Sequence, residues 1–160
     1  MEFKRKLKVF LGTGLKTADD FRVACRADKI AIGHWGDYML NKFIVASVKT
    51  ELNIVVTSPA DLGFKNGVIY GDFCARAENE FYLKRCPAEI GPQMCLQNKN
   101  LLISNDNKTS INVVHEPIIT PHGHSTLFCA MQFESNLWLT ADVFSPVSVV
   151  HPDFLFAFSC

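Results

Sequence analysis

The sequence has no excess of charge of either sign, because Lys and Arg together number 16 and so do Asp and Glu. Proteins that bind nucleic acids usually present a clear basic surplus or patch. The basic run at residues 4–8 is short, and the helix-turn-helix candidate at 17–42 has only Lys42 as a cation near the end of its second helix. Phosphate contacts need several cations. Nucleic acid is therefore not favoured as a partner.

Long apolar runs are also missing. No window approaches the roughly 20 residues that a membrane-spanning helix needs. The apolar stretch at 9–15 is short, is interrupted by glycine and is followed by Lys16, whereas a secretory signal needs a longer apolar core and a cleavage site. We therefore expect a soluble, cytoplasmic protein that does not associate with membranes.

The six cysteines include no C-x-x-C pair. That spacing is typical of thioredoxin-like redox sites and of zinc ribbons, and a reducing compartment disfavours disulfides. Most of the thiols are expected to be buried and to pack as small hydrophobic groups. The chain also has no P-loop, G-x-G-x-x-G or G-x-S-x-G motif, so common nucleotide-binding and serine-hydrolase signatures are excluded. No cofactor is predicted.

What the sequence does contain is enough apolar material for one core. Its 160 residues are 48% hydrophobic and include 13 Phe, and aromatic rings supply much area for burial. This length and composition are typical of one globular domain, spanning 1–160.

Helices are expected in the first half of the chain. Thr17 and Asp20 resemble a capping box and predict a helix as far as Asp28, and a short helix carries Trp35. The central helix is predicted at 71–84, where the apolar residues Phe73, Ala77 and Phe81 recur every four residues. Ser58-Pro59 has the form of another helix start.

Strands follow apolar, β-branched runs separated by turn residues. They are expected at 3–11, 44–48, 52–57, 101–104, 111–115, 126–133, 137–143 and 154–158. The order predicts an α+β fold: N-terminal helices with short strands, then a mostly antiparallel sheet packed on the central helix.

The segment 86–97 combines rigidity with polar groups. Pro87 ends the preceding helix, and Gly91-Pro92 indicates a second turn before an apolar piece that ends at Gln97. Glu89 lies between the two prolines. We predict a rigid corner joining the helical half to the sheet, in which Glu89 pairs with Arg76 of the central helix.

Two catalytic hypotheses involve this segment. Glu89 and Glu116 each lie close to a proline, and two carboxyl groups in different environments can divide acid and base roles. Alternatively, Cys86 follows two basic residues, which lower a thiol pKa, and a histidine nearby would activate it. The negative end of the preceding helix opposes a thiolate there. For each of these residues a structural role is favoured over a catalytic one.

A metal-binding hypothesis involves His115, His122 and His124. His-x-His on an extended segment places two rings on one side, and a third ring from the preceding strand would complete a set of three nitrogen ligands. The spacing matches no standard zinc pattern, and the loop at 120–125 also fits a solvated hairpin.

Several short motifs together resemble a family of small uncharacterised bacterial proteins with no assigned activity, cofactor or fold. They lie at 62–64, 67, 74–77, 86–93, 96–97, 116–118, 137–139 and 151–153. The resemblance implies a bacterial, cytoplasmic, single-domain protein. Between Ile118 and Phe128 the members of that family look to have an acidic turn, whereas this chain has His122 and His124. The resemblance therefore implies that the two histidines are a local variation.

The favoured function is a non-catalytic binding or interaction protein. Its working surface is predicted in the groove between segment 86–97 and the sheet, with polar contacts from Arg76, Glu89, Gln97 and Glu116. The alternatives are a small hydrolase-like enzyme that uses Glu89 and Glu116 or a Cys86–His pair, and a metal-binding protein. The ligand or protein partner and the oligomeric state stay open.

Overall fold

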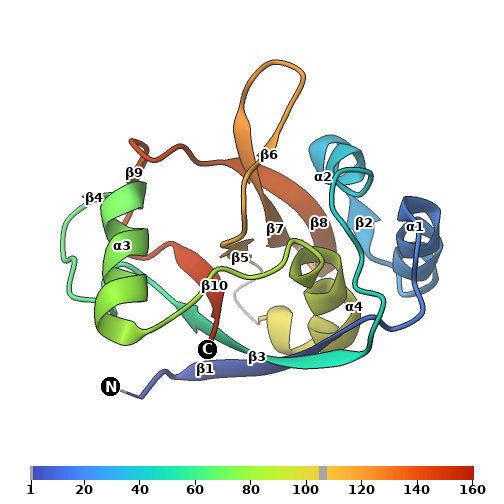
Figure 1. Ribbon diagram of the computed structural model, residues 1–160, viewed down its shortest axis with the longest axis horizontal. Helices are drawn as coiled ribbons and strands as arrows, with labels where there is room; N and C mark the ends of the chain where they lie inside the picture. The colour runs from blue at the N-terminus through green and yellow to red at the C-terminus, as the bar shows by residue number, and fades with distance from the viewer. Residues whose placement is uncertain (1, 105–107) are drawn as a thin grey trace.

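The computed structural model describes residues 2–104 and 108–160 (Figure 1). These residues form four helices and ten strands. In chain order they are β1 Arg5–Leu11, α1 Ala18–Ala27, β2 Ala31–Ile32, α2 His34–Met39, β3 Thr50–Thr57, β4 Val68–Ile69, α3 Tyr70–Phe81, α4 Ile90–Leu102, β5 Lys108–Val113, β6 Ile118–Ile119, β7 Ser125–Phe133, β8 Asn136–Val143, β9 Val149–Val150 and β10 Leu155–Ser159. This arrangement confirms the α+β class. None of these four helices has the length and apolar character needed to cross a bilayer.

One large, mostly antiparallel sheet organises the molecule. Its strands follow the order β1-β3-β10-β5-β7-β8-β2, and β6 adds to β7. Two neighbouring pairs are parallel, β10 with β5 and β2 with β8. Because β10 lies between β3 and β5, strands from the two ends of the chain are interleaved, and the expected N-terminal strands belong to this same sheet.

Helices cover both faces of the sheet. Helices α1, α2 and α4 lie on one side, and α3 lies on the other beside the small β4–β9 pair (Figure 1). Successive residues of a strand point to opposite faces. Strand β10 accordingly sends Ala157 into the core on the α4 side and Phe156 and Phe158 into the core on the α3 side.

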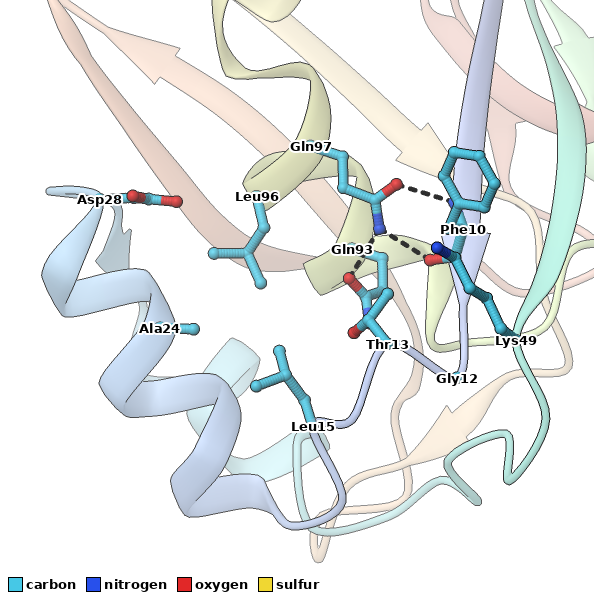
Figure 2. Close-up of a pocket in the computed structure, with 10 residues that line it drawn as sticks. All are labelled: Phe10, Gly12, Thr13, Leu15, Ala24, Asp28, Lys49, Gln93, Leu96 and Gln97. Atoms are coloured by element: carbon cyan, nitrogen blue, oxygen red, sulfur yellow. Dashed lines mark hydrogen bonds between the residues drawn. The ribbon is translucent and has the colours of Figure 1, made fainter.

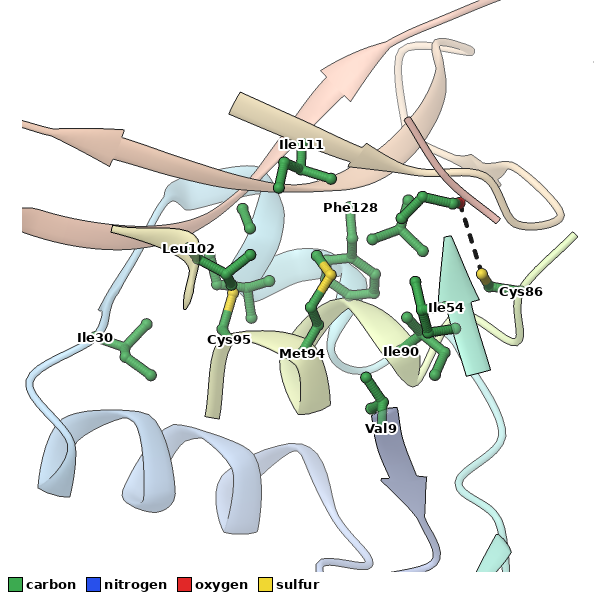
Figure 3. Close-up of a cluster of buried hydrophobic side chains, with 14 of the residues drawn as sticks. Val9, Ile30, Ile54, Cys86, Ile90, Met94, Cys95, Leu102, Ile111 and Phe128 are labelled. Carbon is green, nitrogen blue, oxygen red and sulfur yellow. Dashed lines mark hydrogen bonds between the residues drawn. The ribbon is translucent and has the colours of Figure 1, made fainter. Parts of the chain in front are cut away.

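Helix α4 is the centre of the larger core. Its residues Ile90, Met94 and Cys95 are fully buried and face Phe128 of β7 and other apolar side chains (Figure 3). Each large apolar side chain buried in this way stabilises the fold by about 1.5–3 kcal/mol. The helix is therefore fixed tightly against the sheet.

The structure corrects the rigid corner predicted at 86–97, because α4 begins inside it at Ile90. Pro92 is the third residue of α4. The N–H groups in the first turn of a helix have no intrahelical acceptor, so a proline there, which lacks an N–H, costs no helical hydrogen bond. Gly91 precedes it because a Cβ there would lie 2.5 Å from the Phe128 side chain. The Gly-Pro pair thus marks a closely packed helix start and not a second turn.

Other local predictions had mixed outcomes. The Thr17–Asp20 capping box is confirmed, with both reciprocal hydrogen bonds present. The central helix is confirmed with shorter bounds, since Tyr82 ends it in a left-handed conformation. The strand at 44–48 is wrong, because those residues form a loop in which Ile44 is 95% exposed.

Two further predictions were wrong. Ser58-Pro59 opens a turn and not a helix. The strand at 101–104 is also wrong, because Leu102 ends α4. A short run of apolar residues or a Ser-Pro pair did not suffice to predict the secondary structure here, because the same residue types also occur in loops and in helices.

Candidate functional site

Glu89 is a buried polar junction at the start of α4. Its side chain is only 1% exposed. One carboxyl oxygen accepts from the Gly12 N–H at 3.2 Å and from the Gln93 amide at 3.1 Å, and the other accepts from the Ala46 N–H at 2.8 Å. The positive end of the helix also favours a carboxylate there. Glu89 therefore connects α4 to the loop after β1 and to the loop before β3.

The polar row continues along α4 at four-residue spacing. The Gln93 amide donates to the Thr13 hydroxyl at 2.9 Å, and the Gln97 amide donates to the Gln93 carbonyl at 2.8 Å. Gln97 also binds both backbone groups of Phe10, accepting from its N–H and donating to its C=O, each at 2.7 Å. Because β1 is an edge strand, the Gln97 amide satisfies backbone groups that another strand would otherwise pair.

A cleft of about 450 Å³ opens beside this row, between α1, α4 and the end of β1 (Figure 2). We call it the α1/α4 cleft. Apolar side chains from all sides, Leu15, Ala24 and Leu96, face its middle (Figure 2). The complete lining is Phe10, Gly12, Thr13, Leu15, Ala24, Asp28, Lys49, Gln93, Leu96 and Gln97.

The two ends of the cleft carry opposite charges. The Lys49 ammonium lies 5.0 Å from the centre of the Phe10 ring, and no carboxylate among the described residues pairs with it. Asp28 lies at the far end, on the other side of Leu96 (Figure 2). The cleft thus has an apolar middle, a cationic end and an anionic end.

The structure separates the sequence-predicted site residues. Gln97 lines the α1/α4 cleft, whereas Glu89 lies behind Gln93 and is not among the lining residues described. The predicted Glu89–Arg76 pair is wrong, because α3 lies on the opposite face of the sheet from α4. Arg76 instead pairs with Glu80 at 3.1 Å and stacks over Phe64.

Glu116 lines a different cavity, of about 470 Å³, beside α3. There Arg85 binds Glu116 at 3.2 Å and Glu78 at 3.3 Å. Tyr70 and Cys74 contribute a hydroxyl and a thiol to the same cavity, and burial raises the pKa of both groups. Glu89 and Glu116 therefore share neither of these two cavities.

Cys86 and His115 lie side by side, because a parallel β-bridge joins their backbones. Their side chains nevertheless bind elsewhere. The Cys86 thiol donates to the Ala157 carbonyl at 3.6 Å, and burial raises its pKa to about 12. Such a thiol is almost entirely protonated at neutral pH and is a poor nucleophile.

The His115 ring has both nitrogens occupied. Nε2 accepts from the Phe128 N–H at 2.9 Å, so this nitrogen carries no proton. Nδ1 therefore carries the proton and donates to the Glu116 carbonyl at 2.7 Å. Burial lowers the pKa of His115. The ring is held neutral as a bridge between β7 and the loop that precedes β6.

The three histidines proposed as metal ligands do not converge. The His122 ring packs edge-on against Trp35 of α2, with 6.1 Å between the ring centres, while His115 is buried in the contacts above. Within residues 2–104 and 108–160, no group of three His, Cys, Asp or Glu side chains is arranged to hold a metal ion.

Sequence reasoning missed Gln93 and Lys49 as residues of the cleft. Gln93 could have been found had α4 been recognised, because Glu89, Gln93 and Gln97 then share one helix face at four-residue spacing. Lys49 offered no local signal. It reaches the cleft because the loop before β3 is hydrogen-bonded to Glu89 through Ala46.

Replacing one carboxyl oxygen of Glu89 by an amide NH₂ group should strongly affect the stability of the protein. Glu89→Gln should lower the free energy of unfolding by about 1–3 kcal/mol, because the new NH₂ group faces donors and leaves one of them unpaired. Urea unfolding measures this change. Glu116→Gln, in an exposed ion pair, is the matched control and should stay within about 0.5 kcal/mol. Equal stability of the two variants would contradict the assigned role.

The buried neutral His115 predicts a pH dependence. Its folded-state pKa lies below the ordinary value, so the unfolded chain takes up the proton first as pH falls below about 6.5. Stability should be full above that pH and should decrease below it, until the folded state also protonates. Urea unfolding between about pH 7.5 and 5.5 measures the slope. His115→Gln should flatten it, whereas His151→Gln, at an exposed ring, should not. The same slope in all three proteins would refute this.

Comparison with known proteins returns no relative from which a role could be transferred. No known protein family, curated protein or solved structure matches this chain. The resemblance to a family of small bacterial proteins therefore stays a prediction.

Proposed function

We propose that this chain is a non-catalytic binding protein whose ligand enters the α1/α4 cleft. The observation that carries the proposal is the preformed wall of the cleft. Gln97 is held at both ends of its amide by Phe10 and Gln93, so the wall keeps one shape without a ligand. Sites that are largely preformed lose less conformational entropy on binding.

The lining favours a ligand with an apolar body and one anionic end. Leu15, Ala24 and Leu96 provide the surface that an apolar body would cover. The ammonium group of Lys49 is the natural partner for the anion, because it has no carboxylate partner among the residues described. Asp28 lines the opposite end, where the Lys99 ammonium binds its backbone carbonyl, so Lys49 is the group that would orient the anion.

Binding rather than catalysis is supported by the positions of the reactive groups. The cleft is lined by amides, one hydroxyl, one ammonium and one carboxylate. General acid–base catalysis needs a titratable group within hydrogen-bond reach of the reacting atom, usually with a tuned pKa. Cys86, His115 and Glu116 do not line this cleft. Both carboxyl oxygens of Glu89 accept hydrogen bonds from donors inside the protein.

A fluorescent anion tests the proposal. The dye 8-anilinonaphthalene-1-sulfonate has an apolar body and a sulfonate, and should bind the folded protein saturably with increased fluorescence. Ala24→Phe fills the cleft from α1 and should weaken binding at least about tenfold, since it displaces the apolar body. Ala27→Phe, exposed on the same helix, should bind as the wild type does.

Lys49→Gln tests the contribution of the charge to dye binding, apart from the shape of the cleft. This exposed substitution should leave folding intact, as circular dichroism would check, and should remove most of the salt dependence of dye binding. Dye binding that is unaffected by both Ala24→Phe and Lys49→Gln would contradict the proposed site.

A further inference from the structure

The sheet face on the α3 side holds a second cavity, of about 530 Å³, at the end formed by β5, β7 and β8. The register pairs Ser110 with Met131, Asn112 with Cys129, and Leu127 with Asp142. Directly opposed residues project to the same face of a sheet. The turn before β10 forms another wall. We call this space the Asn112 cavity, and it is separate from the α1/α4 cleft.

Asn112 forms part of its lining as a buried side chain with an unused acceptor. The residue is only 3% exposed. Its amide nitrogen donates to the Leu155 carbonyl at 3.5 Å, but its amide oxygen has no hydrogen-bond partner among the described residues. A buried acceptor without a donor costs free energy that a bound donor would recover.

Among the described residues, the charged groups that line the cavity are carboxylates. Asp142 lies on β8, and burial raises its pKa. Among the described residues no cation pairs with it, and its one hydrogen bond is to the N–H of Val143 at 3.1 Å. Asp153 adds a second carboxylate from the turn before β10. Asp153 lies 3.8 Å from the Nδ1 of His151, a ring that is cationic only when protonated. Asn112 and Asp142 therefore add acceptors to the cavity lining for which the described residues supply no cation.

Aromatic rings complete the lining. Phe133 is 61% exposed and Phe154 is 45% exposed, and both line the cavity. Exposed rings beside carboxylates suit an organic cation, because ring faces attract a cation and also cover its apolar parts. A hydrated metal ion gains little from such rings, since it prefers a shell of oxygen ligands.

We propose that the Asn112 cavity binds an organic cation, an ammonium or guanidinium group carried on an apolar body. The cationic N–H groups would donate to Asp142 and to the Asn112 oxygen, and the body would pack between Phe133 and Phe154. The cation could belong to a small amine or to a lysine side chain of a protein. This site does not depend on the function proposed for the α1/α4 cleft.

The test is a titration of the ¹⁵N-labelled protein followed by NMR. Benzylammonium should shift the amide signals of Asp142 and Phe154 saturably in the millimolar range, up to about 10 mM, whereas uncharged benzyl alcohol should shift them far less. N-acetyl-phenylalanyl-lysine amide, titrated in parallel, presents the same chemistry from a peptide. Tighter binding of the peptide points to a protein lysine, and tighter binding of benzylammonium points to a small amine.

Two variants locate the cation. Asp142→Asn keeps the shape but removes the charge, and should weaken benzylammonium binding about tenfold, because a charge-assisted hydrogen bond is lost. Glu134→Gln removes an exposed charge near the same end of the sheet and should change the affinity less than about twofold.

Phe154→Leu keeps an apolar wall without a ring and should weaken the ammonium more than the alcohol. The proposal is overturned if neither cation produces saturable shifts at these amides, or if Asp142→Asn and the wild type bind benzylammonium equally.

Discussion

The buried carboxyl group of Glu89 is the contact on which this side of the structure depends. It receives N–H donors from two loops that are far apart in the sequence, at Gly12 and Ala46, and one donor from Gln93. These contacts fix the start of α4 relative to β1 and β3. The α1/α4 cleft depends on that position, because Gln93 and Gln97 line it from α4 whereas Gly12 and Lys49 line it from the two loops.

The polar side chains on the two faces of the sheet differ in how completely the protein satisfies their hydrogen bonds. On the α4 side, Glu89, Gln93 and Gln97 use the protein's own donors and acceptors, so the cleft wall is rigid and specificity would come from its shape and from Lys49. On the α3 side, the Asn112 oxygen has no hydrogen-bond partner and the Asp142 carboxylate has no cationic partner among the described residues. A polar network whose hydrogen bonds are all made rigidifies a fold, whereas acceptors without partners can bind a donor from a ligand.

The sequence predicted the fold class better than the site. The capping box at Thr17 and the period of the central helix are local signals, and both were confirmed. Helix α4 was missed because a Gly-Pro pair usually marks a turn, whereas here Pro92 lies in the first turn of a helix and Gly91 packs closely against the Phe128 side chain. Glu89 was predicted to fix a rigid corner through Arg76, but it accepts from the Gln93 amide and from backbone N–H groups of two distant loops. A local sequence pattern does not predict such distant partners.

Glu89 holds the two loops against α4 through its carboxyl oxygens. Amide hydrogen exchange of Gly12 and Ala46 tests this role most directly, because both N–H groups end on the same carboxyl group. Both amides should be protected in the wild type, and both should lose protection together in Glu89→Gln, while the amides of β7 keep theirs. Exchange of Gly12 and Ala46 at unprotected rates in the wild type would contradict it.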